Sequence, residues 1–217
     1  MNYEQNNNQA YVSGEIIEEP TYTHTSFGEG FYEMTISVAR LSGQTDNVPV
    51  TLSERLMENF DLSKGKFISV EGQFRSYNKF LENKSKLMLT VFARSISDFD
   101  EEKNPNSIEV KGYICKEPMY RTTPFKREIC DVLVAVNRAY NKSDYIPCIA
   151  WGRNARYVNS LSVGDRIELV GRIQSRNYQK VTEDGDTLTK TAYEVSISGL
   201  KVERRVNEGL VVNPKAV

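Results

Sequence analysis

Rings and cations alternate along the second half of the chain, at places where we expect strands to end and loops to begin. The rings are Tyr140, Tyr145, Trp151 and Tyr178, and the cations near them are Arg138, Arg153, Arg172, Arg176 and Lys180. A planar ring can stack on a nucleobase while Lys and Arg meet the phosphates, and stacking is worth about 1–3 kcal/mol per base. For any one tyrosine taken alone, core packing or a cross-strand pair is the better interpretation. Four rings with polar or basic neighbours together favour a site for single-stranded nucleic acid.

Other chemistry finds little support in the residue types. The sole histidine, His24, lies in a Thr-rich segment without the spacing of a nucleophilic centre, so we interpret it as a loop residue. Gly28-Glu29-Gly30 lacks the third glycine of a dinucleotide-binding motif, and no GxxxxGK[ST] sequence occurs. Cys115, Cys130 and Cys148 show no CxxC spacing, which favours free thiols over a zinc site or disulfides. We therefore predict a protein that is not an enzyme and has no cofactor and no metal.

The chain repeats itself after about a hundred residues. The matching segments are Val12-Ser13-Gly14 with Val110-Lys111-Gly112, Val38-Ala39-Arg40 with Val136-Asn137-Arg138, and Gly65 and Gly72 with Gly164 and Gly171. The offset is 98 in the first part and 99 at the glycines, so one inserted residue separates the copies over most of their length. A repeat of this length is a whole domain. We predict two domains, residues 1–103 and 104–217.

Short β-branched runs bounded by turn residues predict mostly strands. In the second copy we expect strands at about 107–115, 128–138, 144–151, 166–178 and 189–202, with a short helix between the third and the fourth. In the first copy a helix at 54–60, capped by Ser53, would place Leu56 and Phe60 on one face. This order is typical of a small oligonucleotide-binding (OB) barrel. The sequence predicts an all-β protein with one short helix per domain, built as two tandem OB-fold five-stranded Greek-key barrels.

Glycines and turn residues complete this expectation. Gly72 and Gly171 follow apolar runs and predict the bulges or sharp bends that let a short sheet close. The residues Glu183-Asp184-Gly185-Asp186 predict a hairpin turn between the last two strands. Residues 98–106 are the expected linker between the domains.

The net charge of −1 conceals an asymmetry. Residues 1–103 hold ten Lys and Arg against sixteen Asp and Glu, whereas residues 104–217 hold eighteen against thirteen. The second half is therefore the better partner for a polyanion. No apolar run approaches the roughly 18 residues that span a bilayer, and the first residues lack the features of a signal peptide. We expect a cytoplasmic protein without membrane contact.

The second copy resembles the bacterial single-stranded DNA-binding protein family. The likeness is carried by residues 110–112, 134–140, 149–155 and 163–178, which resemble the family's A-x-x-R-x-W, A-W-G-[KR]-x-A and G-x-x-[IV]-x-[IV]-x-G-[RQ]-[LI]-x-[TS]-R-x-[WY] blocks in the right order. The resemblance implies base stacking at Tyr140, Tyr145, Trp151 and Tyr178. Three of these hold tyrosine where the family commonly has tryptophan, a change that weakens stacking without abolishing it.

Over residues 10–99 the resemblance is fainter and covers framework only. Where the second copy has Tyr140, Tyr145 and Trp151, the first has Ser42, Asn47 and Ser53. Tyr77 and Phe80 lie near the fourth-strand position. We therefore expect the N-terminal barrel to have a degenerate site, to bind weakly if at all, and to serve packing or dimerisation.

By this resemblance the leading hypothesis is largely sequence-independent binding of single-stranded DNA in replication, recombination or repair. A homodimer would offer the four barrels of the family's tetramers. RNA is an alternative ligand, because stacking does not distinguish sugars, and an OB-fold protein-interaction or assembly module without nucleic acid is an alternative from another class. The family often ends in an acidic tail that recruits replication and repair enzymes. Residues 211–217 read Val-Val-Asn-Pro-Lys-Ala-Val, so we do not expect recruitment by that route.

Overall fold

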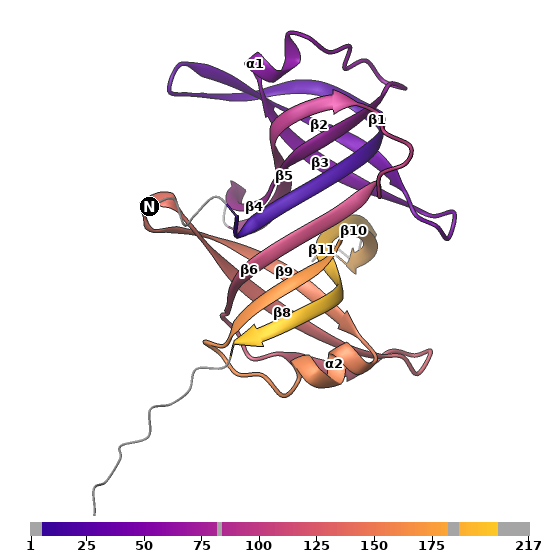
Figure 1. Ribbon diagram of the computed structural model, residues 1–217, viewed down its shortest axis with the longest axis vertical. Helices are drawn as coiled ribbons and strands as arrows, with labels where there is room; N and C mark the ends of the chain where they lie inside the picture. The colour runs from indigo at the N-terminus through magenta and orange to yellow at the C-terminus, as the bar shows by residue number, and fades with distance from the viewer. Residues whose placement is uncertain (1–5, 82–83, 182–186, 204–217) are drawn as a thin grey trace, which may run out of the picture.

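The computed structural model describes residues 6–81, 84–181 and 187–203. Within these ranges eleven strands form one continuous sheet in the order β2-β3-β5-β4-β1-β6-β10-β11-β9-β8-β7. Additional pairings of β1 with β2 and of β6 with β8 close this sheet into two barrels, which lie one above the other in Figure 1. The predicted architecture of two tandem OB-fold barrels is confirmed.

Both barrels follow the same plan. The first consists of β1 (Asn8–Ser26), β2 (Glu29–Ala39), β3 (Thr45–Ser53), α1 (Glu54–Met57), β4 (Phe67–Leu81) and β5 (Lys84–Asp98). The second consists of β6 (Asn106–Ile114), β7 (Met119–Thr122), β8 (Glu128–Arg138), the 3-10 turn η1 (Ala139–Asn141), β9 (Lys142–Trp151), α2 (Arg153–Val158), β10 (Arg166–Val181) and β11 (Thr187–Glu203). In each barrel a parallel pair, β3 with β5 or β9 with β11, completes the Greek key.

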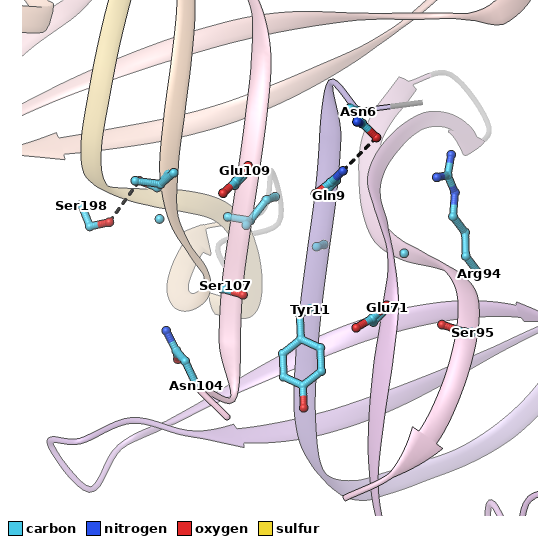
Figure 2. A pocket seen from close by; sticks show the side chains of 15 residues that line it. Asn6, Gln9, Tyr11, Glu71, Arg94, Ser95, Asn104, Ser107, Glu109 and Ser198 are labelled. Atoms are coloured by element: carbon cyan, nitrogen blue, oxygen red, sulfur yellow. Dashed lines mark hydrogen bonds between the residues drawn. The ribbon is translucent and has the colours of Figure 1, made fainter. Parts of the chain in front are cut away.

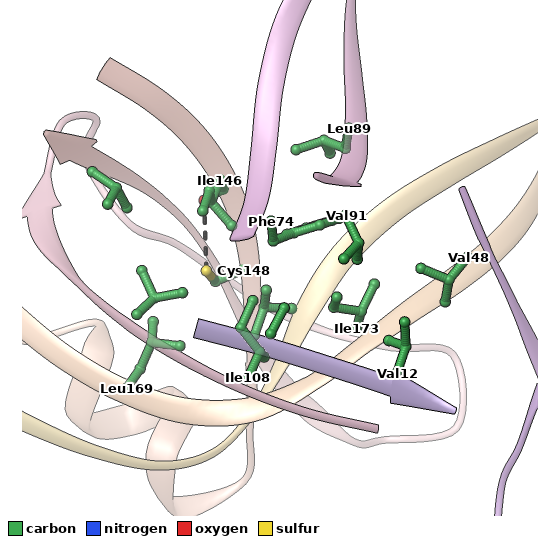
Figure 3. Close-up of a cluster of buried hydrophobic side chains, with 14 of the residues drawn as sticks. Val12, Val48, Phe74, Leu89, Val91, Ile108, Ile146, Cys148, Leu169 and Ile173 are labelled. Carbon is green, nitrogen blue, oxygen red and sulfur yellow. Dashed lines mark hydrogen bonds between the residues drawn. The ribbon is translucent and has the colours of Figure 1, made fainter. Parts of the chain in front are cut away.

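The barrels are filled by the inward side of each strand. Val12, Phe74, Ile108 and Ile173 are among the fully buried side chains that gather around the junction of the barrels (Figure 3). Burial of each such side chain contributes about 1.5–3 kcal/mol. One apolar cluster runs through both barrels, so the two repeats pack as one body.

The two glycines expected to bend the sheet do so. The pairing of β10 with β11 shifts register between Val170 and Gly171, and the pairing of β4 with β5 shifts between Glu71 and Gly72. A Cβ atom on Gly171 would lie 2.3 Å from the carbonyl oxygen of Ser196. The predicted bulges are confirmed, and close backbone approach explains why glycine is needed there.

Local details depart from the sequence prediction. The first helix ends at Met57 rather than at Phe60, and Ser53 makes no capping hydrogen bond. Strand β7 was missed because all four of its residues are exposed, so it lacks an alternating pattern. His24 lies in β1 rather than in a loop.

Two of the predictions concern residues that the structure does not describe. The turn expected at residues 183–186 and the chain end at 211–217 lie outside the described residues. No helix in the part of the chain that the structure describes is long and apolar enough to cross a membrane. Nor do His, Cys, Asp and Glu residues in that part form a group of three or more that could hold a metal ion.

Candidate nucleic-acid interface

The outer face of β9 presents two of the predicted stacking rings. In β9 the side chains of Ile146, Cys148 and Ala150 point into the barrel, so the alternation of a strand places Tyr145 and Trp151 outside. Six residues of strand separate these two rings by about 20 Å. Tyr145 is 45% exposed and Trp151 is 38% exposed. Strand β9 therefore offers two accessible rings on one surface.

Tyr140 stands at the turn that joins β8 to β9. Its backbone is left-handed, with φ 60°, and the following Asn141 has φ 55°. Few tyrosines adopt this conformation, which costs energy for a residue with a Cβ atom. The ring is 93% exposed, so this turn carries the most accessible of the predicted stacking side chains.

Tyr178 reaches the same surface from another strand. In β10 the buried Ile173 points inward, so Arg172, Gln174, Arg176 and Tyr178 lie on the outer side. Strand β11 lies between β10 and β9 in the sheet, and Tyr178 pairs with its Lys190. The structure thus brings Tyr178, which is 37% exposed, onto the outer face that also holds Tyr145 and Trp151.

The predicted cations fall into two groups. Arg153 begins α2 directly after Trp151 and Gly152 and is exposed, and Arg176 is exposed with its Nε 3.9 Å from an oxygen of Glu194. Lys180 belongs to β10 by its backbone, but its side chain lies outside the described part of the structure. Arg138 and Arg172 are instead bound to buried carboxylates.

Arg172 lies at the junction of the barrels. Its Nη1 donates to Oδ2 of Asp46 in the first barrel at 2.8 Å, and its Nη2 donates to Gln174 at 3.1 Å. Burial lowers the pKa of this guanidinium, and the neighbouring Arg40 acts in the same direction. Arg138 has a similar bond, with Nη1 3.1 Å from Oδ1 of Asp144, although 31% of its side chain stays exposed.

Acidic groups on this face are matched by donors. Asp131 of β8 accepts from Nε of Arg121 at 2.8 Å, and Glu194 of β11 accepts from Nε2 of Gln174 at 2.6 Å. Arg121 belongs to β7, the strand that sequence reasoning missed, because all four of its residues are exposed and give no alternating pattern. These donors therefore reduce the repulsion between the carboxylates of this face and a phosphate group.

The corresponding face of the first barrel is built differently. The ring of His24 stacks on Phe31 with centroids 5.2 Å apart, and Phe31 lies 5.8 Å from Phe92. The guanidinium carbon of Arg75 lies 4.1 Å above the Phe92 ring. These groups cover one another's faces, whereas Tyr77 and Phe80, the rings near the fourth-strand position, are exposed.

A surface hollow of about 560 Å³ crosses the junction where β1 meets β6 (Figure 2). None of the eight predicted site residues whose side chains the structure describes lines it. The carboxylates of Glu71 and Glu109 do, with Arg94 as the cation among its lining residues, and both carboxylates are labelled in Figure 2. This composition is a poor match for a polyanion, so we do not assign nucleic acid to this hollow.

Comparison with known proteins finds a family match for the second barrel. Residues 105–203 match the model of the single-strand binding protein family. Over 81 residues the chain is 37% identical to single-stranded DNA-binding protein 1 of Staphylococcus aureus strain COL, covering 34% of this chain and 48% of that protein. It is 33% identical over 81 residues to single-stranded DNA-binding protein A of Bacillus subtilis strain 168, covering 34% and 47%. The chain thus spans about half the length of these relatives.

The whole fold has a counterpart among solved structures. A deletion mutant of the single-stranded DNA-binding protein from Thermus aquaticus superposes with a TM-score of 0.69 at 22% identity, covering 91% of this chain and 94% of that one. The wild-type protein from the same organism gives 0.66 at 23% identity. The likeness in shape extends over both barrels. The match to the family model covers residues 105–203, which form the second barrel.

Proposed function

We propose that this chain binds single-stranded DNA without catalysis and largely independently of base sequence, in replication, recombination or repair. Bases would stack on Tyr140, Tyr145, Trp151 and Tyr178, while phosphates would meet Arg138, Arg153, Arg176 and Lys180. The observation that carries the proposal is the joint exposure of Tyr145 and Trp151 on one face of β9. We leave Arg172 out of this set because both Asp46 and Gln174 engage its guanidinium, whereas Arg138 donates to Asp144 alone among the described residues.

A titration with oligo-dT tests the proposal directly. Trp151 is the sole tryptophan of the chain, so intrinsic tryptophan fluorescence reports on this one position. We expect quenching on stacking, and an apparent affinity that falls with salt, with a log–log slope of about −0.7 for each phosphate neutralised. Absence of binding at low salt and high micromolar protein would contradict the proposal. Competition with an RNA of matched sequence measures the preference between sugars.

We further propose that two chains associate as a homodimer. Two barrels per chain then make four barrels in the assembly, enough to present two ring-bearing faces to one long strand. Light scattering at micromolar concentration, with and without a long oligonucleotide, tests this. A mass of one chain under both conditions would contradict it.

A further inference from the structure

Strands β4 and β10 each reach over to the opposite barrel and make the same contacts there. The backbone N–H of Ser76 in β4 donates to Oδ1 of Asp144 at 2.8 Å, and its Oγ accepts from the N–H of Tyr145 at 2.7 Å. Correspondingly, the N–H of Ser175 in β10 donates to Oδ1 of Asp46 at 2.8 Å, and its Oγ accepts from the N–H of Asn47 at 3.0 Å.

The two sets of contacts differ in what they hold. On one side the residue held by the serine hydroxyl is Tyr145, a proposed stacking residue, and Asp144 also binds Arg138. On the other side it is Asn47, and Asp46 binds Arg40 and Arg172. The same pair of hydrogen bonds therefore holds an aromatic residue, Tyr145, on one side of the junction only.

The two strands also carry their arginines at different positions: β4 has Gln73 and Arg75 where β10 has Arg172 and Gln174. Arg75 precedes Ser76 in β4, and its Nη2 donates to Oε1 of Gln73 at 2.7 Å. Burial lowers the pKa of Arg75 to about 10, the neighbouring Arg138 and Arg94 add to this, and Asp144 opposes it. The guanidinium stays charged at pH 7, so Arg75 adds a second cation near Arg138. The residue that corresponds to Arg75 in β10 is the neutral Gln174.

We propose that strand β4 of the first barrel completes the single-stranded DNA site of the second. Ser76 is a positioning residue that fixes the start of β9, and with it Tyr145 and the Asp144–Arg138 pair. Arg75 adds a phosphate contact from the first barrel. This inference rests on the proposed function and gives the first barrel a role in binding through β4, apart from any ring of its own.

The internal symmetry supplies a matched control for Ser76. Ser76→Ala and Ser175→Ala each remove one hydroxyl acceptor in the same setting, so we expect similar small decreases in melting temperature. Only Ser76→Ala should weaken oligo-dT binding, by about threefold to tenfold, the range that corresponds to loss of one hydrogen bond. Equal affinities of the two variants at matched temperature would overturn the positioning role.

Arg75 is tested by its salt dependence. Arg75→Gln introduces the residue that β10 carries at the corresponding position, and we expect it to reduce the log–log salt slope by about 0.7. Arg172→Gln, the control, should leave the slope unchanged because its guanidinium is bound to Asp46. An unchanged slope for Arg75→Gln would overturn the contact. If Trp151→Ala also bound normally, the proposed function itself would fail, so the two failures are distinguishable.

Discussion

Ala10 of β1 lies directly opposite Ile108 of β6 in the antiparallel pairing that joins the barrels. With the repeat offset of 98, Ile108 is the counterpart of Ala10, so a residue pairs with its own repeat equivalent. This is the geometry of a local twofold axis, as in a symmetric dimer. The contacts of Ser76 and Ser175 at the junction accordingly form a matched pair, and contacts without a counterpart show where the two copies differ.

The rings of the second barrel should dominate binding. We expect replacement of Trp151 and Tyr178 by Ala to remove most of the affinity for oligo-dT, because each stacked ring is worth about 1–3 kcal/mol. Tyr77→Ala with Phe80→Ala serves as the control pair on the first barrel and should matter less. Fluorescence anisotropy with a labelled oligonucleotide measures both, and the reverse ranking would refute the assignment.

The bulge glycines should be equally intolerant of a side chain in both barrels. A Cβ atom would lie 2.2 Å from the carbonyl oxygen of Phe92 at Gly72 and 2.3 Å from that of Ser196 at Gly171. We expect Ala at either position to lower the free energy of unfolding by about 1–3 kcal/mol, the usual cost of overpacking. Gly199→Ala is the control, since its Cβ atom would meet only a Val170 methyl group at 3.1 Å. Urea denaturation that found Gly199→Ala the most damaging would contradict this account.

The two buried aspartates should differ in their contribution to stability. Asp46 accepts from Arg40, Arg172 and the Ser175 N–H, whereas Asp144 accepts from Arg138 and the Ser76 N–H. Breaking a buried ion pair costs about 3–5 kcal/mol at most, and less here because the arginines are partly exposed. We expect Asp46→Asn to lower the melting temperature more than Asp144→Asn does. A larger loss at Asp144 would show that the second guanidinium adds nothing.

The three thiols should react slowly in the folded protein. All are free; burial raises the pKa of Cys130 to about 11 and also raises the pKa values of Cys115 and Cys148. A raised pKa leaves less thiolate at pH 8, and the thiolate is the reactive form. Alkylation followed by mass spectrometry should modify Cys115 first, because Cys130 and Cys148 are buried. Rapid labelling of Cys148 without denaturant would contradict this order.

Much of the fold could be predicted because its signals are local. Alternation of apolar residues located β8 to within its observed bounds, and turn residues and glycines located the bulges at Gly72 and Gly171. The same local reasoning failed at the first helix, which ends at Met57 and is not capped by the side chain of Ser53. It also missed β7, which is stabilised by pairing with β8 rather than by a buried face.

The candidate site shows the same division. Residue types alone indicated which rings could stack, and strand alternation is enough to place Tyr145 and Trp151 on one face. Arg172 was grouped with the phosphate-binding cations because its partner Asp46 lies 126 positions away in the chain. The contact of Ser76 with Tyr145 spans 69 positions and was equally invisible.

The sequence by itself determined the repeat, the two barrels, the bends at their glycines and the candidate stacking rings, because each depends on neighbours along the chain. Only the tertiary structure decided which side chains meet across the junction. Those meetings follow from the pairing of β1 with β6, which sets the two barrels about a local axis and brings β4 over β9 and β10 over β3. Such pairing depends on the shapes of two finished barrels, and no short stretch of residues encodes it.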